Sequence, residues 1–515
     1  MVKLLSKRDK NNFNTMNKQI IGLVLGPLLY LLVILFGNFE GLSPEGQAVL
    51  AATFWMAIWW VTETVPIAIT ALLPLVLFPL SGAMTIKATG ATYGHPIIFL
   101  FIGGFMIATA IERWNLHKRV ALNIIAKIGS RPKSIILGFM IATGFLSMWI
   151  SNTATTIMMV PIGVAIVGQI TGNAKASDNN FAKALLLGIA YSASIGGIAT
   201  LIGTPTNVIF TGVVAERYNV DISFATWMLF AMPIAVFLLF VCWYYLVNIG
   251  FDLSNFDKDD NNEGLDKIKE YQAQLGLMSY EEKVVIGVFG LVALSWMTRS
   301  FLFNPWLPNL SDPIIALIGT LLLFIIPSKR NPKVRQTVDV VLDDVDDSFG
   351  TILDWETAVK IPWGVILLFG GGLSLANAFQ IAGLADWIGT QIALIGTLPL
   401  FILLLLLIAS VNFLTEITSN VATVSMILPV LAALSISIGV HPYMLMIGAT
   451  CAASCAFMLP VATAPNAIVF GSSYIKIGDM VKAGIWLNLL SILLFSIYVY
   501  FVMPLVFGID IYGSL

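Results

Sequence analysis

Two polar clusters interrupt long apolar stretches of this 515-residue sequence. The first is Ser151-Asn152-Thr153, within "MWISNTATTIMMVPIG", and the second is Ser419-Asn420, within "TSNVATVSMILPVL". Ser, Thr and Asn cap helices, and the backbone N–H groups at a helix N-terminus bind anions. Their side-chain oxygens, with backbone carbonyls at the ends of interrupted helices, suit Na+. The two clusters therefore have the chemistry to bind an anion beside a cation.

These clusters carry no basic side chain. No Arg, Lys or His lies in 147–153 or 415–421, nor in the stretches around Pro205 and Pro465. An anionic substrate would be held by helix dipoles, hydroxyls and amides, beside a bound cation. Glu416 is the one carboxylate near a cluster. Both a structural role, accepting hydrogen bonds from the nearby backbone, and a functional role stay open for it.

The composition shows what kind of chain must position these clusters. Hydrophobic residues make up 58% of the sequence and charged residues 11%, and the mean hydropathy is +0.89. These values are typical of an all-α polytopic membrane protein in contact with the lipid bilayer. The net charge of -2 argues against nucleic acid as a partner.

Apolar runs of roughly 20 residues predict membrane spans. Eleven such runs lie near 19–37, 47–63, 66–83, 97–111, 182–214, 226–250, 281–304, 312–328, 363–382, 442–472 and 480–508. Two further stretches, 134–170 and 396–438, are each broken at the centre by Ser-Asn and later by a proline. We interpret these two as re-entrant hairpins, which gives about eleven transmembrane helices plus two hairpins.

Basic residues predict the orientation, because they concentrate in short cytoplasmic loops. With a cytoplasmic N-terminus, the clusters at 113–133, 329–335 and 476–482 all fall inside if each hairpin enters and leaves on one face. Hairpin 134–170 then enters from the inside and hairpin 396–438 from the outside, with the C-terminus outside. The polar segments 251–280 and 329–360 are expected to be solvated cytoplasmic connectors.

The chain repeats one plan twice. Residues 97–212 match 364–473: "SNTATTIMMVPIG" corresponds to "SNVATVSMILPVL", and "GTPTNVIF" to "TAPNAIVFG", with Pro205 set against Pro465. The predicted orientation makes the second copy inverted relative to the first. Inverted repeats with interrupted helices, here 182–214 and 442–472, indicate a secondary transporter with its binding site where the interruptions meet.

At these residues the sequence resembles the divalent anion/sodium symporter family, which includes the sodium-dependent dicarboxylate transporters of Gram-positive bacteria. The resemblance covers essentially the whole chain. Its carriers are Ser151-Asn152-Thr153, Ser419-Asn420-Val421, Gly203-Thr204-Pro205 and Thr463-Ala464-Pro465-Asn466. The family implies a homodimer in the bacterial cytoplasmic membrane, with a transport domain that moves against a scaffold by an elevator mechanism.

The resemblance also implies a division of the chain. Scaffold helices occupy 1–96, and the first inverted repeat occupies 97–225. Further scaffold helices and cytoplasmic loops occupy 226–362, and the second repeat with the last helix occupies 363–515. The expected function is cotransport of C4-dicarboxylates (succinate, malate and fumarate) with Na+ as the coupling ion.

Site residues carried over from the family motifs form three sets. The first Na+ site would use Ser147, Ser151, Asn152 and Gly203. The second would use Thr415, Thr418, Asn420 and Ala462. The substrate carboxylates would meet Asn152, Thr153, Ser419, Asn420, Thr463 and Pro465. One departure is Val421, where the family usually has Thr; losing one hydrogen bond costs about 0.5 to 1.5 kcal/mol, enough to alter the preference among dicarboxylates.

Other interpretations stay open at this level. The protein could exchange dicarboxylates without Na+, or carry 2-oxoglutarate, citrate or sulfate. The polar residues could simply link helices, although this does not explain their clustering at the same points in both repeats. A channel filter would need carbonyl or charge rings from several subunits. An enzyme is not expected, because no Ser or Cys lies with a His or Asp at a plausible depth.

Overall fold

The apolar runs of the sequence fold into helices throughout. A computed structural model describes residues 2–171, 179–254, 263–329, 350–392 and 398–513. Among these residues nine helices are long and apolar enough to cross a membrane. One isolated antiparallel bridge joins Pro327 and Thr351. The prediction of an all-α polytopic membrane protein is confirmed.

The helices follow the predicted spans closely. In the first half they are α1 (Val2–Phe36), α2 (Pro44–Thr62), α3 (Ile67–Thr70), α4 (Leu73–Ser81), α5 (Ile86–Thr92), α6 (Pro96–Arg113), α7 (Leu116–Ile128), α8 (Pro132–Ser147), α9 (Asn152–Thr171), α10 (Asn180–Ile198), α11 (Pro205–Tyr218) and α12 (Phe224–Tyr245), which continues as the π-helical turn η2 (Leu246–Gly250). In the second half they are α13 (Glu263–Leu275), α14 (Tyr280–Thr298), η3 (Arg299–Phe303), α15 (Asp312–Ile325), α16 (Trp355–Ala358), α17 (Trp363–Ile381), α18 (Leu384–Ile392), α19 (Leu400–Thr415), α20 (Asn420–Ser437), α21 (Pro442–Ala453), α22 (Ala464–Gly471), α23 (Ile477–Phe501) and α24 (Met503–Phe507).

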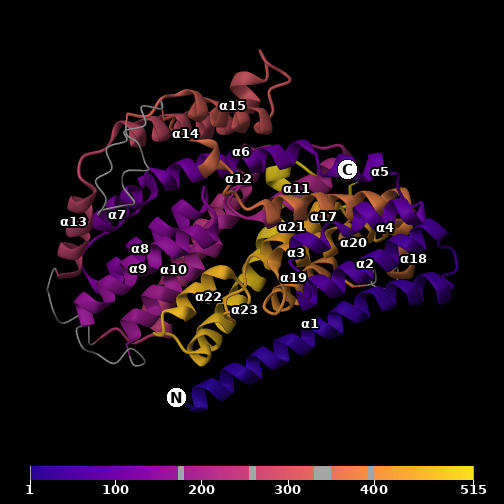
Figure 1. Cartoon of the computed structure of the whole chain (residues 1–515), viewed down its shortest axis with the longest axis horizontal. Coiled ribbons are helices and arrows are strands. Elements are labelled where there is room, and N and C mark those ends of the chain that lie inside the picture. Colours follow the sequence, from indigo (N-terminus) through magenta and orange to yellow (C-terminus); the bar gives the residue numbers. More distant parts are fainter. Residues whose placement is uncertain (1, 172–178, 255–262, 330–349, 393–397, 514–515) are drawn as a thin grey trace, which may run out of the picture.

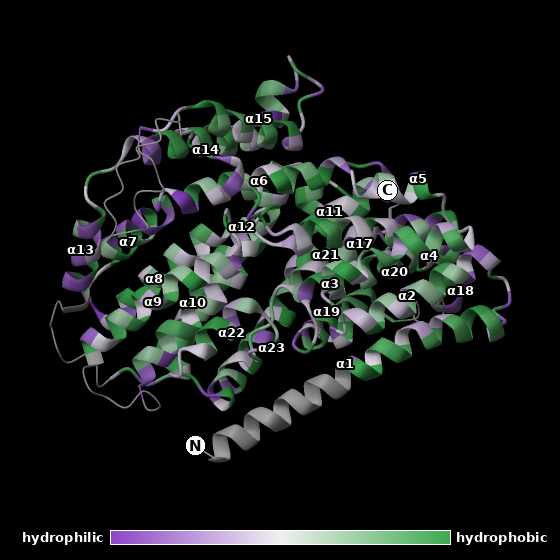
Figure 2. Ribbon diagram, in the orientation of Figure 1, coloured by the Kyte–Doolittle hydropathy of each residue, from purple (hydrophilic) through white to green (hydrophobic). Residues whose placement is uncertain are grey.

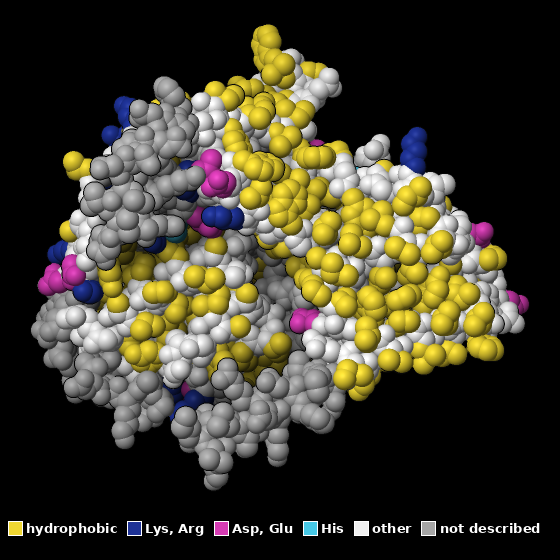
Figure 3. All heavy atoms as spheres, in the orientation of Figure 1, with side chains coloured by type: hydrophobic (Ala, Val, Ile, Leu, Met, Phe, Trp, Pro, Cys, Tyr) yellow, Lys and Arg dark blue, Asp and Glu magenta, His cyan; other side chains and the backbone are white. Residues whose placement is uncertain are grey.

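The surface matches a lipid environment. Hydrophobic residues dominate the long helices, whereas hydrophilic residues gather on α7, α13 and the connections (Figure 2). On the face shown in Figure 3, hydrophobic side chains cover most of the surface over α2, α4 and α18. Leu80 is 81% exposed and Leu35 is 68% exposed. Apolar side chains with this exposure are stable against acyl chains rather than water.

Both predicted hairpins form, and each turns at its Ser-Asn pair. The first consists of α8 and α9, separated by residues 148–151, which we call the first tip. The second consists of α19 and α20, separated by residues 416–419, the second tip. The prolines do not break the hairpins as expected, because α9 runs through Pro161 and α20 through Pro429. Proline removes one backbone hydrogen bond from a helix. A membrane helix tolerates this loss when neighbouring groups bond to the freed carbonyl.

The two helices predicted to be interrupted, 182–214 and 442–472, are each interrupted in the structure. Residues 199–204, the first break, separate α10 from α11, and residues 454–463, the second break, separate α21 from α22. Thr204 occupies the N-cap position of α11 and Thr463 that of α22, where the Thr463 side chain also accepts the capping hydrogen bond. The equivalent residues are therefore these two threonines, so the match of Pro205 to Pro465 is wrong by one position.

The two repeats interlock. Helix α10 packs on α8 and α9, and α21 packs on α19 and α20. Beyond each break the chain crosses to the other repeat: α22 packs on α9 and α10, whereas α11 packs on α20 and α21. Figure 1 shows α22 between the α8–α10 group and the α19–α21 group. Each broken helix thus ties its own hairpin to the opposite one.

The segment 251–280 is more structured than a solvated connector. It contains α13, which packs on α7, and Gln272 Nε2 donates to Asn123 Oδ1 at 2.9 Å. The hydrophobic face of α13 includes the buried Ile268. Short amphipathic helices such as α7 and α13 lack the length that a search for spans requires. Most of the segment 329–360 falls outside the described residues, as do Lys175 and the side chains of residues 1–18.

Close backbone contact between α8 and α10 gives a first prediction. A Cβ added at Gly196 would overlap the backbone of Gly144. We expect Gly196→Ala to destabilise the protein by about 1 to 3 kcal/mol, because relieving the overlap requires α8 and α10 to shift their backbones apart. The melting temperature in detergent measures this effect. The control is Gly168→Ala in α9, where a new Cβ meets no atom within 4 Å; equal losses in both variants would contradict the packing argument.

Candidate functional site

The first tip brings three predicted residues together. Ser147 ends α8 and is fully buried, and its Oγ donates to Asn152 Oδ1 at 2.5 Å. Asn152 is the first residue of α9 and is half-buried. Ser151 Oγ accepts from Ala154 N at 3.2 Å, which is the expected capping bond at the start of α9. The pair Ser147–Asn152 therefore fixes the orientation of the Asn152 amide at the tip.

The first break lies directly against this tip. Thr200 Oγ1 donates to the Met148 carbonyl at 2.5 Å. A Cβ on Gly197 would lie 2.7 Å from Asn152 Oδ1 and 3.1 Å from the Gly203 carbonyl oxygen. The Asn152 amide and the Gly203 carbonyl thus meet over Gly197, which has no side chain to separate them. The fold therefore places Ser147, Asn152 and Gly203 close together.

The second tip repeats this arrangement. Thr415 ends α19, is fully buried, and donates to Asn420 Oδ1 at 2.6 Å and to the Ala453 carbonyl at 3.2 Å. Thr415 thus corresponds to Ser147, and Asn420 to Asn152. Thr418 Oγ1 bonds within the hairpin, to Thr423 Oγ1 at 2.7 Å and the Leu414 carbonyl at 2.8 Å. In both hairpins a hydroxyl at the end of the first helix donates a hydrogen bond to the asparagine that starts the second helix.

Glu416 binds the second break to the second tip. Its Oε1 accepts from Phe457 N at 2.8 Å and Met458 N at 2.9 Å, and its Oε2 accepts from Leu459 N at 2.9 Å. Asn488 Nδ2 donates a fourth hydrogen bond to Oε1 at 2.7 Å. A carboxylate only accepts, so it matches four donors on unwound backbone and α23. Of the two roles left open for Glu416, these contacts support the structural one.

Two asparagines that received no role from the sequence, Asn207 and Asn466, stabilise the breaks. Asn207 Nδ2 donates to the carbonyls of Gly197, Ile198 and Thr200 at 3.2, 3.1 and 2.7 Å. Asn466 Nδ2 donates to the carbonyls of Ala456 and Leu459, both at 3.1 Å. Both side chains are fully buried.

The signal for these asparagines was present in the sequence. Each lies three positions after the capping threonine, Thr204 or Thr463, of its broken helix. Setting Pro205 against Pro465 hid this correspondence. Aligning the helix caps would have revealed it, because a buried side-chain amide is the ordinary partner for carbonyls left open at a helix end.

The second break contacts the two helices, α10 and α11, that flank the first break. Thr206 Oγ1 is hydrogen-bonded to Ser454 Oγ at 2.8 Å, and both side chains are buried. The Tyr191 ring packs edge-on against Phe457, with 5.1 Å between ring centroids. These contacts join the first repeat to the second at the level of the interruptions.

The remaining predicted residues lie at the second tip, at the end of the second break and at the starts of α9 and α22. Ser419 caps α20 and is half-buried, and Thr463 Oγ1 accepts from Asn466 N at 3.2 Å. Ala462 is buried at the end of the second break, and Pro465 is buried in the first turn of α22. Thr153 is exposed in the first turn of α9. The N-termini of α9, α11, α20 and α22 thus all belong to the tip and break regions, which favours binding of negative charge.

Known proteins are similar to this chain over nearly its whole length. Residues 17–507 match the family model described as the sodium:sulfate symporter transmembrane region. The chain is 47% identical over 514 residues to the sodium-dependent dicarboxylate transporter SdcS of Staphylococcus saprophyticus, covering 98% of this chain and 95% of that protein. It is 46% identical over 522 residues to SdcS of Staphylococcus aureus, covering 99% and 97%.

Solved structures with the same fold are membrane transporters. The YdaH transporter of Alcanivorax borkumensis superposes with a TM-score of 0.54 at 13% identity, covering 89% of this chain and 98% of that one. MtrF of Neisseria gonorrhoeae superposes with a TM-score of 0.56 at 12% identity, covering 90% and 96%. These likenesses concern the fold, whereas the family match spans nearly every residue in sequence. The chain belongs to the sodium:sulfate symporter family, also called the divalent anion/sodium symporter family.

Proposed function

We propose that this protein is a secondary active transporter that moves C4-dicarboxylates such as succinate, malate and fumarate across the bacterial cytoplasmic membrane, coupled to Na+. The observation that carries the proposal is the repeated hydroxyl–amide pair, Ser147 with Asn152 and Thr415 with Asn420. The similar proteins named sodium-dependent dicarboxylate transporters support the same substrate class and coupling ion.

Each pair forms part of one Na+ site. The first site uses oxygens of Ser147, Ser151, Asn152 and Gly203, and the second uses oxygens of Thr415, Thr418, Asn420 and Ala462. These ligands are neutral, so each bound Na+ adds one positive charge beside its asparagine, and only the second tip also holds a carboxylate, Glu416, which is occupied by four N–H donors. That charge attracts the substrate carboxylates, which is a physical basis for coupling.

The substrate binds between the tips. One carboxylate meets Asn152 and Thr153, and the other meets Ser419 and Asn420, with Thr463 and Pro465 completing the site. Helix N-termini supply N–H groups and positive dipole ends in place of basic side chains. The half-buried state of Asn152 and Asn420 supports this assignment, because a transported anion must reach both amides.

The hairpins and broken helices move as one transport domain in an elevator mechanism. Their interlocked packing, α22 on α9 and α11 on α20, supports a single moving body. The scaffold comprises 1–96 and 226–362 and forms a homodimer, with the N-terminus cytoplasmic and the C-terminus outside.

Labelled succinate uptake into proteoliposomes tests the proposal. We expect uptake into vesicles without internal substrate, driven by an inward Na+ gradient and lost when K+ or choline replaces Na+. Uptake that ignores Na+ but requires internal dicarboxylate would identify an exchanger and overturn the coupling. If unlabelled succinate inside the vesicles does not accelerate uptake, the protein is a pore rather than a carrier. If sulfate or citrate inhibits uptake but unlabelled succinate does not, the substrate class is different.

Val421 gives a prediction about substrate preference. It follows Asn420 directly, is half-buried, and packs on the hydrophobic core. Val421→Thr adds one hydroxyl without changing side-chain volume much, so we expect the ratio of succinate to malate inhibition constants to change by about two- to tenfold. Competition with labelled succinate uptake measures both constants. Unchanged constants would remove Val421 from the specificity argument.

A further inference from the structure

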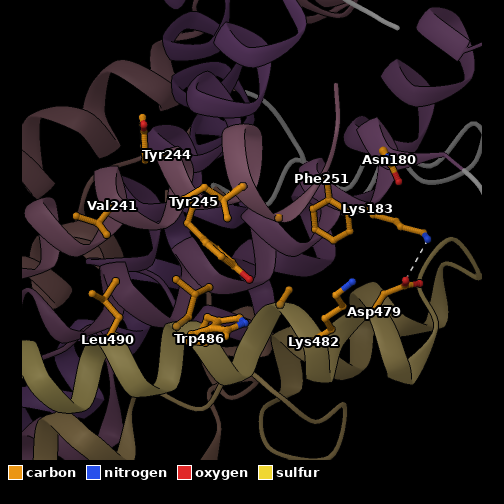
Figure 4. A pocket seen from close by; sticks show the side chains of 14 residues that line it. Asn180, Lys183, Val241, Tyr244, Tyr245, Phe251, Asp479, Lys482, Trp486 and Leu490 are labelled. Atoms are coloured by element: carbon orange, nitrogen blue, oxygen red, sulfur yellow. Dashed lines mark hydrogen bonds and ion pairs between the residues drawn. The ribbon is translucent and has the colours of Figure 1, made fainter. Parts of the chain in front are cut away.

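A cavity of about 800 Å³ lies away from the tips, between the start of α10, the end of α12 with η2, and α23. Figure 4 shows its two ends. Asn180, Lys183, Asp479 and Lys482 lie toward one end, and Val241, Tyr244 and Leu490 lie at the other, with Trp486 between them. The cavity is therefore amphipathic, and its volume is within the range of sites that hold a small organic ligand.

The polar end carries one uncompensated positive charge. Lys183 Nζ and Asp479 Oδ1 form an ion pair at 3.1 Å, so these two charges offset each other. Lys482 has no carboxylate partner among the residues that the structure describes, and Figure 4 shows its ammonium directed toward the cavity. A ligand with a single negative charge at this end would complement the site.

The apolar part of the cavity includes aromatic side chains that are exposed on the protein surface. Trp486 is 61% exposed and Tyr244 is 57% exposed, and both lie on helices that can cross a membrane. Exposed Trp and Tyr are typical of the depth at which lipid headgroups begin. Lys482 and Leu490 are eight residues apart on α23, or about 12 Å along the helix axis, so the cavity extends from the headgroup region into the acyl region.

We propose that this cavity binds one anionic phospholipid of the bilayer. The headgroup phosphate pairs with Lys482, and the upper part of an acyl chain lies against Trp486 and Leu490. Basic pockets between membrane helices recognise lipid headgroups in this way. The Lys183–Asp479 ion pair borders the headgroup and joins α10 to α23, so the bound lipid lies beside a contact between the two repeats.

Native mass spectrometry of the detergent-purified full chain, titrated with phosphatidylglycerol or with phosphatidylcholine of the same chain length, tests the proposal. We expect one phosphatidylglycerol to bind more tightly than phosphatidylcholine. Lys482→Gln should weaken this binding by about fivefold, the effect of one basic residue near an anionic lipid, and Lys482→Arg should restore it. Trp486→Ala should weaken binding of both lipids. Circular dichroism and melting temperature verify that each variant folds.

The matched control is Lys476→Gln, which removes an exposed charge from the same end of α23 but does not line the cavity. Equal loss of binding in both glutamine variants would show general surface attraction and overturn the proposal. Equal affinity for phosphatidylglycerol and phosphatidylcholine would also overturn it. Palmitate binding as tightly as phosphatidylglycerol would overturn it as well. Disulfide linkage of two copies through Trp486→Cys in vesicles would assign the cavity to contact between copies of this chain and overturn lipid occupancy.

Discussion

Asn152→Ala and Asn420→Ala should each reduce Na+-driven succinate uptake by at least about 100-fold. Each amide is proposed to interact with one Na+ and one substrate carboxylate. Losing an interaction with a charged group costs about 1.5 to 3 kcal/mol, and about 1.4 kcal/mol corresponds to a tenfold change in an equilibrium constant. Loss of two such interactions at one residue therefore gives the stated reduction.

Uptake in proteoliposomes measures the loss, and Na+-dependent thermal stabilisation locates it. A ligand that binds only the folded protein raises its stability, so wild-type protein should melt at a higher temperature in Na+ than in K+. Each alanine variant should lose part of that difference. Gln169→Ala is the matched control, because Gln169 is an exposed amide elsewhere on α9. Normal uptake in either tip variant would refute the site assignment.

Glu416→Gln should lower both the melting temperature and the rate of uptake. The four donors around Glu416 all require an acceptor, and a glutamine turns one of its two acceptors into a donor. At least one buried N–H then loses its partner, at a cost of about 1 to 3 kcal/mol. Glu416→Ala removes the carboxylate from all four donors, of which Phe457 N keeps a second acceptor in Asn488 Oδ1, and should have the larger effect. Differential scanning fluorimetry and uptake together measure these changes.

The control variant is Asn488→Ala, which removes one of the four donors and leaves the carboxylate in place. It should cost less stability than Glu416→Gln, because no backbone N–H is left unpaired. A Glu416→Gln variant with wild-type melting temperature and altered Na+ dependence would contradict the positioning role. That result would place the carboxylate in direct contact with the coupling ion.

Local signals in the sequence were sufficient for the hairpins. Ser151-Asn152 and Ser419-Asn420 predicted where each hairpin turns, because a capping residue starts a helix whatever surrounds it. The family resemblance, rather than a local signal, indicated Ser147 and Thr415, and in the structure each of these hydroxyls donates to its asparagine. Of the residues predicted for the first Na+ site, the fold brings Ser147, Asn152 and Gly203 close together.

Two predictions were wrong because contacts with distant parts of the chain outweighed a local signal in the sequence. Pro161 and Pro429 did not end their helices, because packing against neighbouring helices stabilises the remaining turns. Part of the connector 251–280 became α13 because α7 offers it an apolar face. In both cases the deciding contact comes from another part of the chain.

The sequence by itself determined the membrane class, the repeat, the interruptions and the neutral polar chemistry of the tips. Each of these follows from composition or from residues within a few positions of one another. Only the tertiary structure decided that Glu416 binds the backbone of residues 457–459, that Thr206 meets Ser454 across 248 positions, and that Lys183 pairs with Asp479 across 296 positions. Such pairings depend on how whole helices pack, because a buried polar group bonds to whichever partner the fold brings within reach.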